Sequence, residues 1–379
     1  MAFSPKFRFA GALLALAVLT SLPAHAFISL NDGSDHLYAT GTASLAYDSN
    51  IFAHAGGDGD YIYSAGLILE YSRRAGLIGV NASVAVNASR FGSNTTQDFN
   101  NPAFTAEFIK SGGRTTGSLK LLAARESQAD AVAGLRTESW NYDAGLKFKY
   151  PVIERYSFSG NLDYSDRIYD EPTALTDLQT YTAGTDLLYA LTSTRDLVAG
   201  YQFRRSQTSS ASSFDDHAFT VGVSGRILAK LNGSLRAGYE VRSPRGATND
   251  GAYRGLTASG SLTWSVSSKL TMNGQVSRDV SVTANNQSVN TTSASLGLNL
   301  TLRDNLSLTG TAGGGQSRFL DAIDASRHDE YLTWGTGLKY KMNEHLDTSL
   351  NYLFDQNWST FSYSDFTRHM ITVTLSSRW

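Results

Sequence analysis

Polar and apolar residues alternate one by one along most of the chain beyond residue 36. In the segment Trp140–Tyr150 the even-numbered residues are apolar or aromatic, while the odd-numbered ones include Asp143 and Lys147. Successive side chains of a β-strand point to opposite faces, whereas a helix would scatter this pattern around its circumference. The same split recurs at 156–165 and at 295–302. The pattern therefore predicts an all-β fold.

The two faces of these strands have the polarity of a membrane barrel. Charged residues such as Arg236 and Glu240 stand in mid-strand, where the core of a soluble sandwich would exclude them. Many apolar faces carry aromatic residues at their ends, as in 61–71, which is typical of the aromatic girdles around a lipid-facing band. We therefore expect an apolar outer surface and a polar lumen.

Short and long connections alternate along the chain, which is typical of transmembrane antiparallel up-and-down β-barrels of the outer-membrane type. Eight hairpin turns and nine longer loops predict eighteen strands, with sixteen as the alternative, and place both ends of the barrel on the periplasmic side. The short connections lie near 73–76, 112–114, 151–153, 193–196, 230–232, 267–269, 303–305 and 343–345. The longer ones are 48–60, 92–101, 128–137, 170–176, 208–215, 243–251, 283–288, 320–326 and 359–364.

The first residues have the form of an export signal. Lys6 and Arg8 precede an apolar run, and small residues at the end of Met1–Ala26 fit a signal-peptidase site. The alternative, a membrane anchor, would need a run of about 20 apolar residues. We expect Met1–Ala26 to be cleaved and residues 27–379 to form one barrel in the outer membrane of a Gram-negative-type cell.

The last strand carries a second targeting pattern. Counting back in twos from Trp379 gives Leu375, Val373 and Ile371, an apolar face that ends on an aromatic residue. It resembles the C-terminal strand that bacterial barrel-assembly machinery recognises, although Ser377 departs from it. We expect that machinery, outer-membrane lipid and lipopolysaccharide as partners.

Composition excludes several other classes of function. The chain has no cysteine, so disulfides and thiolate metal sites are excluded. Loss of the signal peptide takes two of the 32 basic residues and none of the 34 acidic ones, which leaves a net charge of −4. That balance does not indicate a nucleic-acid partner. A Pro count of 6 suits hydrogen-bonded strands.

At the end of the first barrel strand stands the hexapeptide Tyr47, Asp48, Ser49, Asn50, Ile51, Phe52, followed by an Asp/Gly-rich loop. Together with the C-terminal strand it resembles the family called putative β-barrel porin 2, whose members include barrels encoded in exopolysaccharide operons. The resemblance implies an outer-membrane barrel with a tie to exopolysaccharide production or export. Asp48, Ser49 and Asn50 are turn formers that can cap the strand. Alternatively, the loop they open folds over or into the lumen and narrows it.

An eighteen-strand barrel leaves an aqueous lumen. The charged residues on the polar faces are our candidates for its lining: Asp143, Lys147, Lys149, Asp163, Arg167, Asp186, Arg204, Arg236, Glu240, Arg242, Asp279, Lys339, Lys341, Asp347 and Asp355. One hypothesis opposes a basic arc to an acidic one and predicts a transverse field that selects solutes. The basic arc holds Lys147, Lys149, Arg204, Arg236 and Arg242, and the acidic arc holds Asp279, Asp347 and Asp355. In the alternative, each charge only solvates the wall.

Catalytic and metal sites have weak support in the sequence. The mature histidines are not paired at metal-ligand spacing. The group Asp321, Asp324, His328, Asp329 and Glu330 reads as a solvated loop tip, with an acid–base pair as the alternative. His54, Asp58 and Asp60 could supply ligands to a divalent cation, but the fixed spacing of a calcium loop is missing. We expect no enzyme activity, metal or cofactor.

Two functions remain open from the sequence. One is a channel serving exopolysaccharide export, which rests on the family resemblance. The other is a diffusion porin for small polar solutes or sugars, which follows from barrel width. A structural or adhesive barrel is a third reading.

Overall fold

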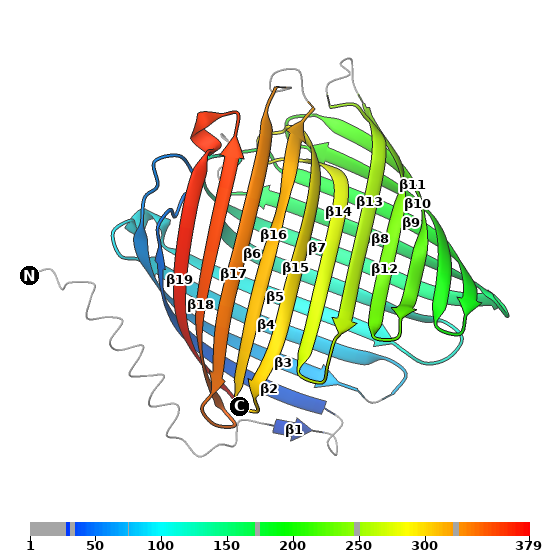
Figure 1. Ribbon diagram of the computed structural model, residues 1–379, viewed down its shortest axis with the longest axis horizontal. Helices are drawn as coiled ribbons and strands as arrows, with labels where there is room; N and C mark the ends of the chain where they lie inside the picture. The colour runs from blue at the N-terminus through cyan, green and yellow to red at the C-terminus, as the bar shows by residue number, and fades with distance from the viewer. Residues whose placement is uncertain (1–27, 31–34, 75, 171–174, 246–250, 321–325) are drawn as a thin grey trace, which may run out of the picture.

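A computed structural model describes residues 28–30, 35–74, 76–170, 175–245, 251–320 and 326–379. The predicted signal peptide Met1–Ala26 lies outside the described residues. Within them, eighteen antiparallel strands close a barrel (Figure 1), as the alternation predicted. Their bounds are β2 Asp35–Asp48, β3 Asp60–Arg73, β4 Gly79–Phe91, β5 Phe99–Lys110, β6 Thr116–Asp130, β7 Leu135–Ile153, β8 Tyr156–Tyr169, β9 Leu178–Thr192, β10 Arg195–Thr208, β11 Ser213–Leu228, β12 Leu231–Pro244, β13 Tyr253–Ser265, β14 Leu270–Val282, β15 Ser288–Arg303, β16 Leu306–Phe319, β17 His328–Lys341, β18 Leu346–Ser359 and β19 Phe366–Arg378.

The barrel closes where the last strand pairs with the first. Ile371 of β19 lies opposite Tyr47 of β2. Below the end of this ladder, the main chains of Ala39 and Trp379 exchange hydrogen bonds of 2.9 and 3.0 Å. The Trp379 ring stacks on His345, with ring centres 4.4 Å apart. A further strand, β1 (Ile28–Leu30), pairs with the start of β2.

Short turns gather at the end of the barrel where β1 and the C-terminus lie, and long connections at the other end (Figure 1). Two predicted connections were misplaced. Residues 151–153 belong to β7, which takes a register shift beside Pro151, so the turn follows at Glu154. Most of 128–137 is also strand, because the β6–β7 ladder continues to Asp130 and Leu135.

Two ladders stop early on the side of the long connections. Pairing between β5 and β6 ends at Ala103 and Ala124, directly beside Pro102, which has no N–H to donate. Pairing between β13 and β14 ends at Ala258 and Arg278. Above these points the hairpins β6–β7 and β14–β15 stay paired within themselves but separate from the preceding strand.

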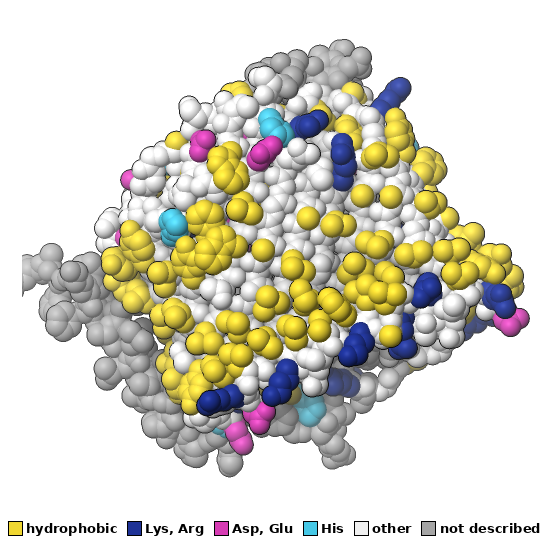
Figure 2. Space-filling view, in the orientation of Figure 1, with side chains coloured by type: hydrophobic (Ala, Val, Ile, Leu, Met, Phe, Trp, Pro, Cys, Tyr) yellow, Lys and Arg dark blue, Asp and Glu magenta, His cyan; other side chains and the backbone are white. Residues whose placement is uncertain are grey.

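The wall has an apolar outer face and a polar inner one. Phe219 and Val221 of β11 are 62% and 67% exposed on the outside, while Asp216 and Thr220 alternate with them. Figure 2 shows apolar side chains over much of one outer face, with charged ones toward its upper and lower edges. No helix among the described residues is long and apolar enough to cross a membrane.

Candidate functional site

Strands β10 to β14 bring four of the charged candidates together on the inner side of the wall, with Asp216, which was not predicted from the sequence. The Arg204 guanidinium lies 2.8 Å from Asp216, 3.0 Å from Glu240 and 2.8 Å from Asp279. Arg242, whose side chain is 0% exposed, makes two bonds of 2.7 and 2.8 Å to Asp216. We call these five residues the arginine cluster. Because its charges pair with their neighbours, they project little field across the lumen.

The same two arginines also bond the backbone of β14 above the point where it leaves β13. Arg204 donates to the carbonyl of Val280 at 2.6 Å, and Arg242 donates to the carbonyls of Val280 and Ser281 at 3.2 Å each. Val280 is 0% exposed. The top of β14 therefore lies against the inner face of the wall, and the arginines replace part of its lost ladder.

Arg236 forms a second, separate pair below the cluster. Its guanidinium makes two bonds to Asp186, at 2.7 and 3.1 Å, and Ser159 donates to the same carboxylate at 3.3 Å. Gly200 leaves room for this pair, since a Cβ there would stand 2.3 Å from an Asp186 oxygen. This pair, one arginine and one carboxylate, is neutral as a unit.

The other candidates are spread around the ring. Lys149 pairs with Asp196 at 3.3 Å, and Lys339 pairs with Asp347 at 2.9 Å. Three others have polar or charged neighbours: Arg167 donates to Asn141 and lies 3.9 Å from Glu126, Asp163 accepts a bond from Asn161, and Asp355 lies 4.0 Å from Arg368. Among the described residues, Asp143, Lys147 and Lys341 form no ion pair.

These contacts correct the hypothesis of a transverse field between a basic and an acidic arc. Asp279 was assigned to the acidic arc, yet it is the direct partner of Arg204 from the basic arc. The inward bend of β14 causes this, because it carries Asp279 onto the inner face of β10 and β12. Local pairing therefore neutralises most of the basic arc.

The inner face from β13 to β17 differs from this charged side. Between its two rims the inward-facing residues are Ser, Thr, Asn, Gln and Gly, with one tyrosine, Tyr331. Several bond one another, such as Ser277 with Ser293 at 2.7 Å. The uncharged wall, as we name this surface, includes Thr257, Ser259, Ser261, Thr263, Asn273, Gln275, Ser277, Ser293, Ser295, Thr309, Thr311 and Thr333.

The family-like hexapeptide caps β2 and also turns into the mouth of the barrel. Asp48 binds Arg368 of β19 at 2.6 Å and accepts the N–H of Asn50 at 3.0 Å. Ile51 is 0% exposed, and its carbonyl accepts a bond of 3.1 Å from Arg136 of β7. The loop that the hexapeptide opens therefore lies within the mouth.

Arg136 was missed from the sequence. Its guanidinium also lies over the rings of Phe91 and Phe99, 5.1 and 5.8 Å from their centres. Alternation places Arg136 on the same face as Trp140, which is the lipid side. It reaches these partners because the end of the β6–β7 hairpin extends over the mouth, and no local signal reports that bend.

The tip of the β6–β7 hairpin is built from four residues. The Asp130 carboxylate accepts the N–H groups of Val132 and Ala133 at 2.8 and 3.0 Å. Gly134 closes the turn at φ +68°, a left-handed conformation that glycine adopts without strain. This short turn keeps the two strands paired to their ends, at Asp130 and Leu135.

The two separated hairpins meet across the mouth. Asn285, between β14 and β15, donates to the Val132 carbonyl at 3.3 Å, and Ser364 donates to the Ala131 carbonyl at 2.8 Å. An apolar cluster of Tyr169, Leu175 and Ala284, packed against Ala133 and Leu135, joins both hairpins to the connection between β8 and β9.

The size of the ring shows what these contacts span. Strands β6 and β14 are eight positions apart in an eighteen-strand ring. At a strand spacing of about 4.8 Å and a tilt of about 40°, that ring is about 35 Å across. Loops so far apart along the wall touch only by crossing the mouth. We call the contacts of Asn285 and Ser364 with the β6–β7 turn, together with the apolar cluster, the mouth bridge.

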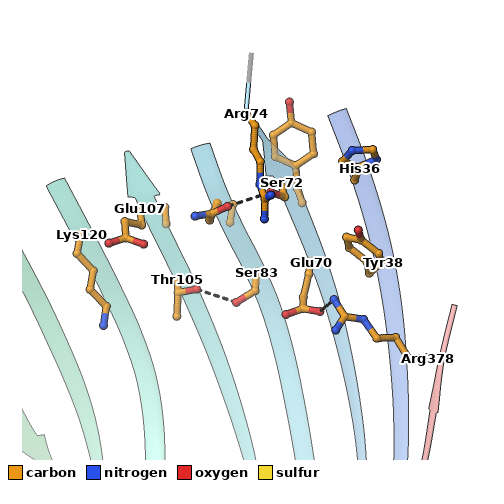
Figure 3. A pocket seen from close by; sticks show the side chains of 14 residues that line it. His36, Tyr38, Glu70, Ser72, Arg74, Ser83, Thr105, Glu107, Lys120 and Arg378 are labelled. Atoms are coloured by element: carbon orange, nitrogen blue, oxygen red, sulfur yellow. Dashed lines mark hydrogen bonds and ion pairs between the residues drawn. The ribbon is translucent and has the colours of Figure 1, made fainter. Parts of the chain in front are cut away.

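At the opposite end, a cavity of about 520 Å³ is lined mainly by polar side chains of β2 to β6 and by Arg378 of β19 (Figure 3). Arg378 pairs with Glu70 at 3.0 Å and lies 4.4 Å from the centre of the Tyr38 ring. Glu107 and Lys120 face each other across β5 and β6. Polar and charged side chains therefore line this end of the lumen.

The candidate catalytic and metal groups remain unassembled. Asp321 and Asp324 lie outside the described residues. His328 bonds Glu330 at 3.1 Å, whereas Asp329 binds Arg327 instead, at 2.8 Å. In the described part of the chain, no three His, Asp or Glu side chains are grouped to hold a metal ion.

Comparison with known proteins confirms the family resemblance over part of the chain. Residues 213–378 match the family described as Putative beta-barrel porin 2. No curated protein matches.

Several solved outer-membrane proteins are similar in structure over most of the chain. OccK2 (OpdF) of Pseudomonas aeruginosa is 11% identical with a TM-score of 0.50, over 91% of this chain and 97% of that one. A BenF-like porin of Pseudomonas fluorescens Pf-5 is 13% identical with a TM-score of 0.48, over 90% and 99%. The outer membrane protein opdK of Pseudomonas aeruginosa is 12% identical with a TM-score of 0.47, over 90% and 99%. The molecule is an integral outer-membrane barrel of the porin-like type.

Proposed function

We propose that this porin-like outer-membrane barrel, whose residues 213–378 match the Putative beta-barrel porin 2 family, conducts neutral polar solutes of the carbohydrate class. The uncharged wall from β13 to β17 carries the proposal. Its hydroxyl and amide groups can exchange hydrogen bonds with a sugar in place of water, without a charged group to trap it. Selection then rests on size and hydrogen bonding.

The charged half of the lumen fits the same proposal. The Arg236–Asp186 pair is neutral, and the arginine cluster holds two arginines against three carboxylates, a formal net charge of −1. A paired charge attracts a passing ion far less than a free one. Strong selection between anions and cations is therefore not expected from the wild-type protein.

In this proposal the mouth bridge is the gate of the channel. Solute leaves or enters only when the β6–β7 and β14–β15 hairpins move apart. Because these contacts are few and lie at loop tips, they belong to the part of the molecule that opens at low cost in free energy.

An exopolysaccharide chain is the finer form of the proposal. The family resemblance implies it, and the uncharged wall supports it, since a long chain that slides needs many weak, equivalent contacts and no single strong one. A knockout strain tests this form: secreted polysaccharide should fall and be restored by the wild-type gene. Normal secretion in the knockout would exclude exopolysaccharide as the transported solute and would leave the proposal of a sugar channel standing.

Swelling of proteoliposomes tests the sugar channel. We expect uptake of neutral mono- and disaccharides, and slower uptake of sugar acids of the same size. Ser295→Arg places a charge on the uncharged wall and should lower neutral disaccharide uptake at least about twofold, while Ser295→Thr leaves it unchanged. Equal uptake by both variants, or no sugar uptake by wild type, would overturn the proposal.

A further inference from the structure

The wall between β13 and β14 is open over its upper part. Residues Tyr253–Thr257 of β13 pair only with β12, and residues Asp279–Val282 of β14 pair only with β15. The last link is a bond of 2.9 Å from the Thr257 hydroxyl to the Arg278 carbonyl. Above it the two strands diverge.

A groove lies outside this seam and a cavity lies inside it. The groove, of about 630 Å³, faces the membrane and is shaped by Val276, Ala294, Gly314, Leu332 and Trp358. A row of polar residues forms one end of it: Arg278, Thr292, Gln316 and Glu330. The cavity, of about 350 Å³, faces the lumen beside Arg204 and Arg236. Three residues line both spaces: Ala258, Ser277 and Arg278.

Small residues make the groove, and a cation marks its end. Ala294 and Gly314 lie opposite each other on β15 and β16, between the larger Val276 and Leu332. At the seam, the Nε of Arg278 is buried and has no hydrogen-bond partner among the described residues. An unsatisfied buried donor on an arginine is costly and fits an anionic group.

The seam between β5 and β6 makes a useful contrast. There, Arg125 of β6 reaches the Asn100 carbonyl of β5 at 3.4 Å and also binds Glu138 and Asp170. That arginine is satisfied and ties the two edges together. At β13–β14, by contrast, the groove outside and the cavity inside share lining residues.

We propose that the β13–β14 seam is a lateral portal that binds a single-chain anionic amphiphile, with the acyl chain in the groove and the acidic head at Arg278. The surroundings of the groove are the acyl chains of the membrane, so a hydrocarbon chain is the occupant its apolar lining meets. The proposal goes beyond sugar conduction and does not depend on it.

Binding of a fluorescent fatty acid, cis-parinaric acid, to the purified barrel tests the groove. Ala294→Leu fills it and Arg278→Gln removes its cation, and each should weaken binding about tenfold. Ala312→Leu enlarges an outward-facing alanine of the neighbouring strand outside the groove and should leave binding unchanged. Equal binding by all variants overturns the proposal. Loss of an oligomer in Ala294→Leu would overturn it in favour of an interface between copies.

Quenching by membrane lipid tests the opening itself. The chain has no cysteine, so a fluorophore can be placed on Ser277→Cys alone. A lipid with a nitroxide in mid-chain should quench it, but not a fluorophore on Ser261→Cys, which lies inside the fully paired part of the same ladder. Equal quenching at both sites excludes the portal, whatever the sugar-uptake assay shows.

Discussion

Removing the mouth bridge should open the channel. Leu175→Ala takes a buried leucine from the apolar cluster, and Asn285→Ala removes the bond to the Val132 carbonyl. The leucine contributes about 2 kcal/mol at this rim position. The hydrogen bond contributes about 1 kcal/mol. The double variant should therefore raise the ratio of open to closed channels about 100-fold.

Single-channel recording in planar bilayers measures this ratio directly. Wild type should dwell mostly in a low-conductance state, and the double variant mostly in a high-conductance one. Asn343→Ala is the matched control, because it removes an asparagine that caps a turn at the opposite end, where it accepts the N–H groups of His345 and Leu346 at 2.9 Å. The control should behave as wild type.

The reasoning fails on one clear result. If the double variant keeps the wild-type open fraction while its barrel remains equally resistant to heat in a gel-shift assay, the hairpins bridge the mouth without gating it. A loss of heat resistance together with noise in the current would instead report a damaged barrel, and Leu175→Val would then replace Leu175→Ala.

Three further outcomes follow from the lumen and the closing strand. Asp216→Asn leaves the buried Arg242 without its carboxylate and should lower the free energy of unfolding by about 3 kcal/mol, measured by urea denaturation in detergent. Arg236→Gln frees the Asp186 carboxylate, and the reversal potential in a salt gradient should shift toward cation selectivity. Trp379→Ala removes the stacking on His345 and should reduce the amount of barrel in the outer membrane, seen by cell fractionation.

Strand positions and strand number could be predicted because the signal is local. Alternation with a period of two depends only on neighbours in sequence, and each turn is specified by a few consecutive residues. The polarity of the faces follows in the same way. The charged residues that β10 to β12 place inside, such as Arg204 and Arg242, were found by this rule alone.

The partners of those residues could not be predicted. Asp279 binds Arg204 because the top of β14 bends inward, and that bend depends on contacts between residues far apart in the chain. Asn285 and Val132 are 153 residues apart, and Ser364 and Ala131 are 233 apart. Pro102 is the one local sign of a seam, since it cannot extend a ladder to β6.

Closure of the mouth and opening of the side wall have one structural cause. The bend of β14 brings Asn285 to the other hairpin and also separates β14 from β13 above Arg278. A hairpin that returns to the wall would regain its ladder with β13 and close the seam. Leu175→Ala with Asn285→Ala should therefore weaken the quenching of a fluorophore on Ser277→Cys while it raises the open fraction. If both signals rise together, the hairpin does not return to the wall, and the two routes are independent.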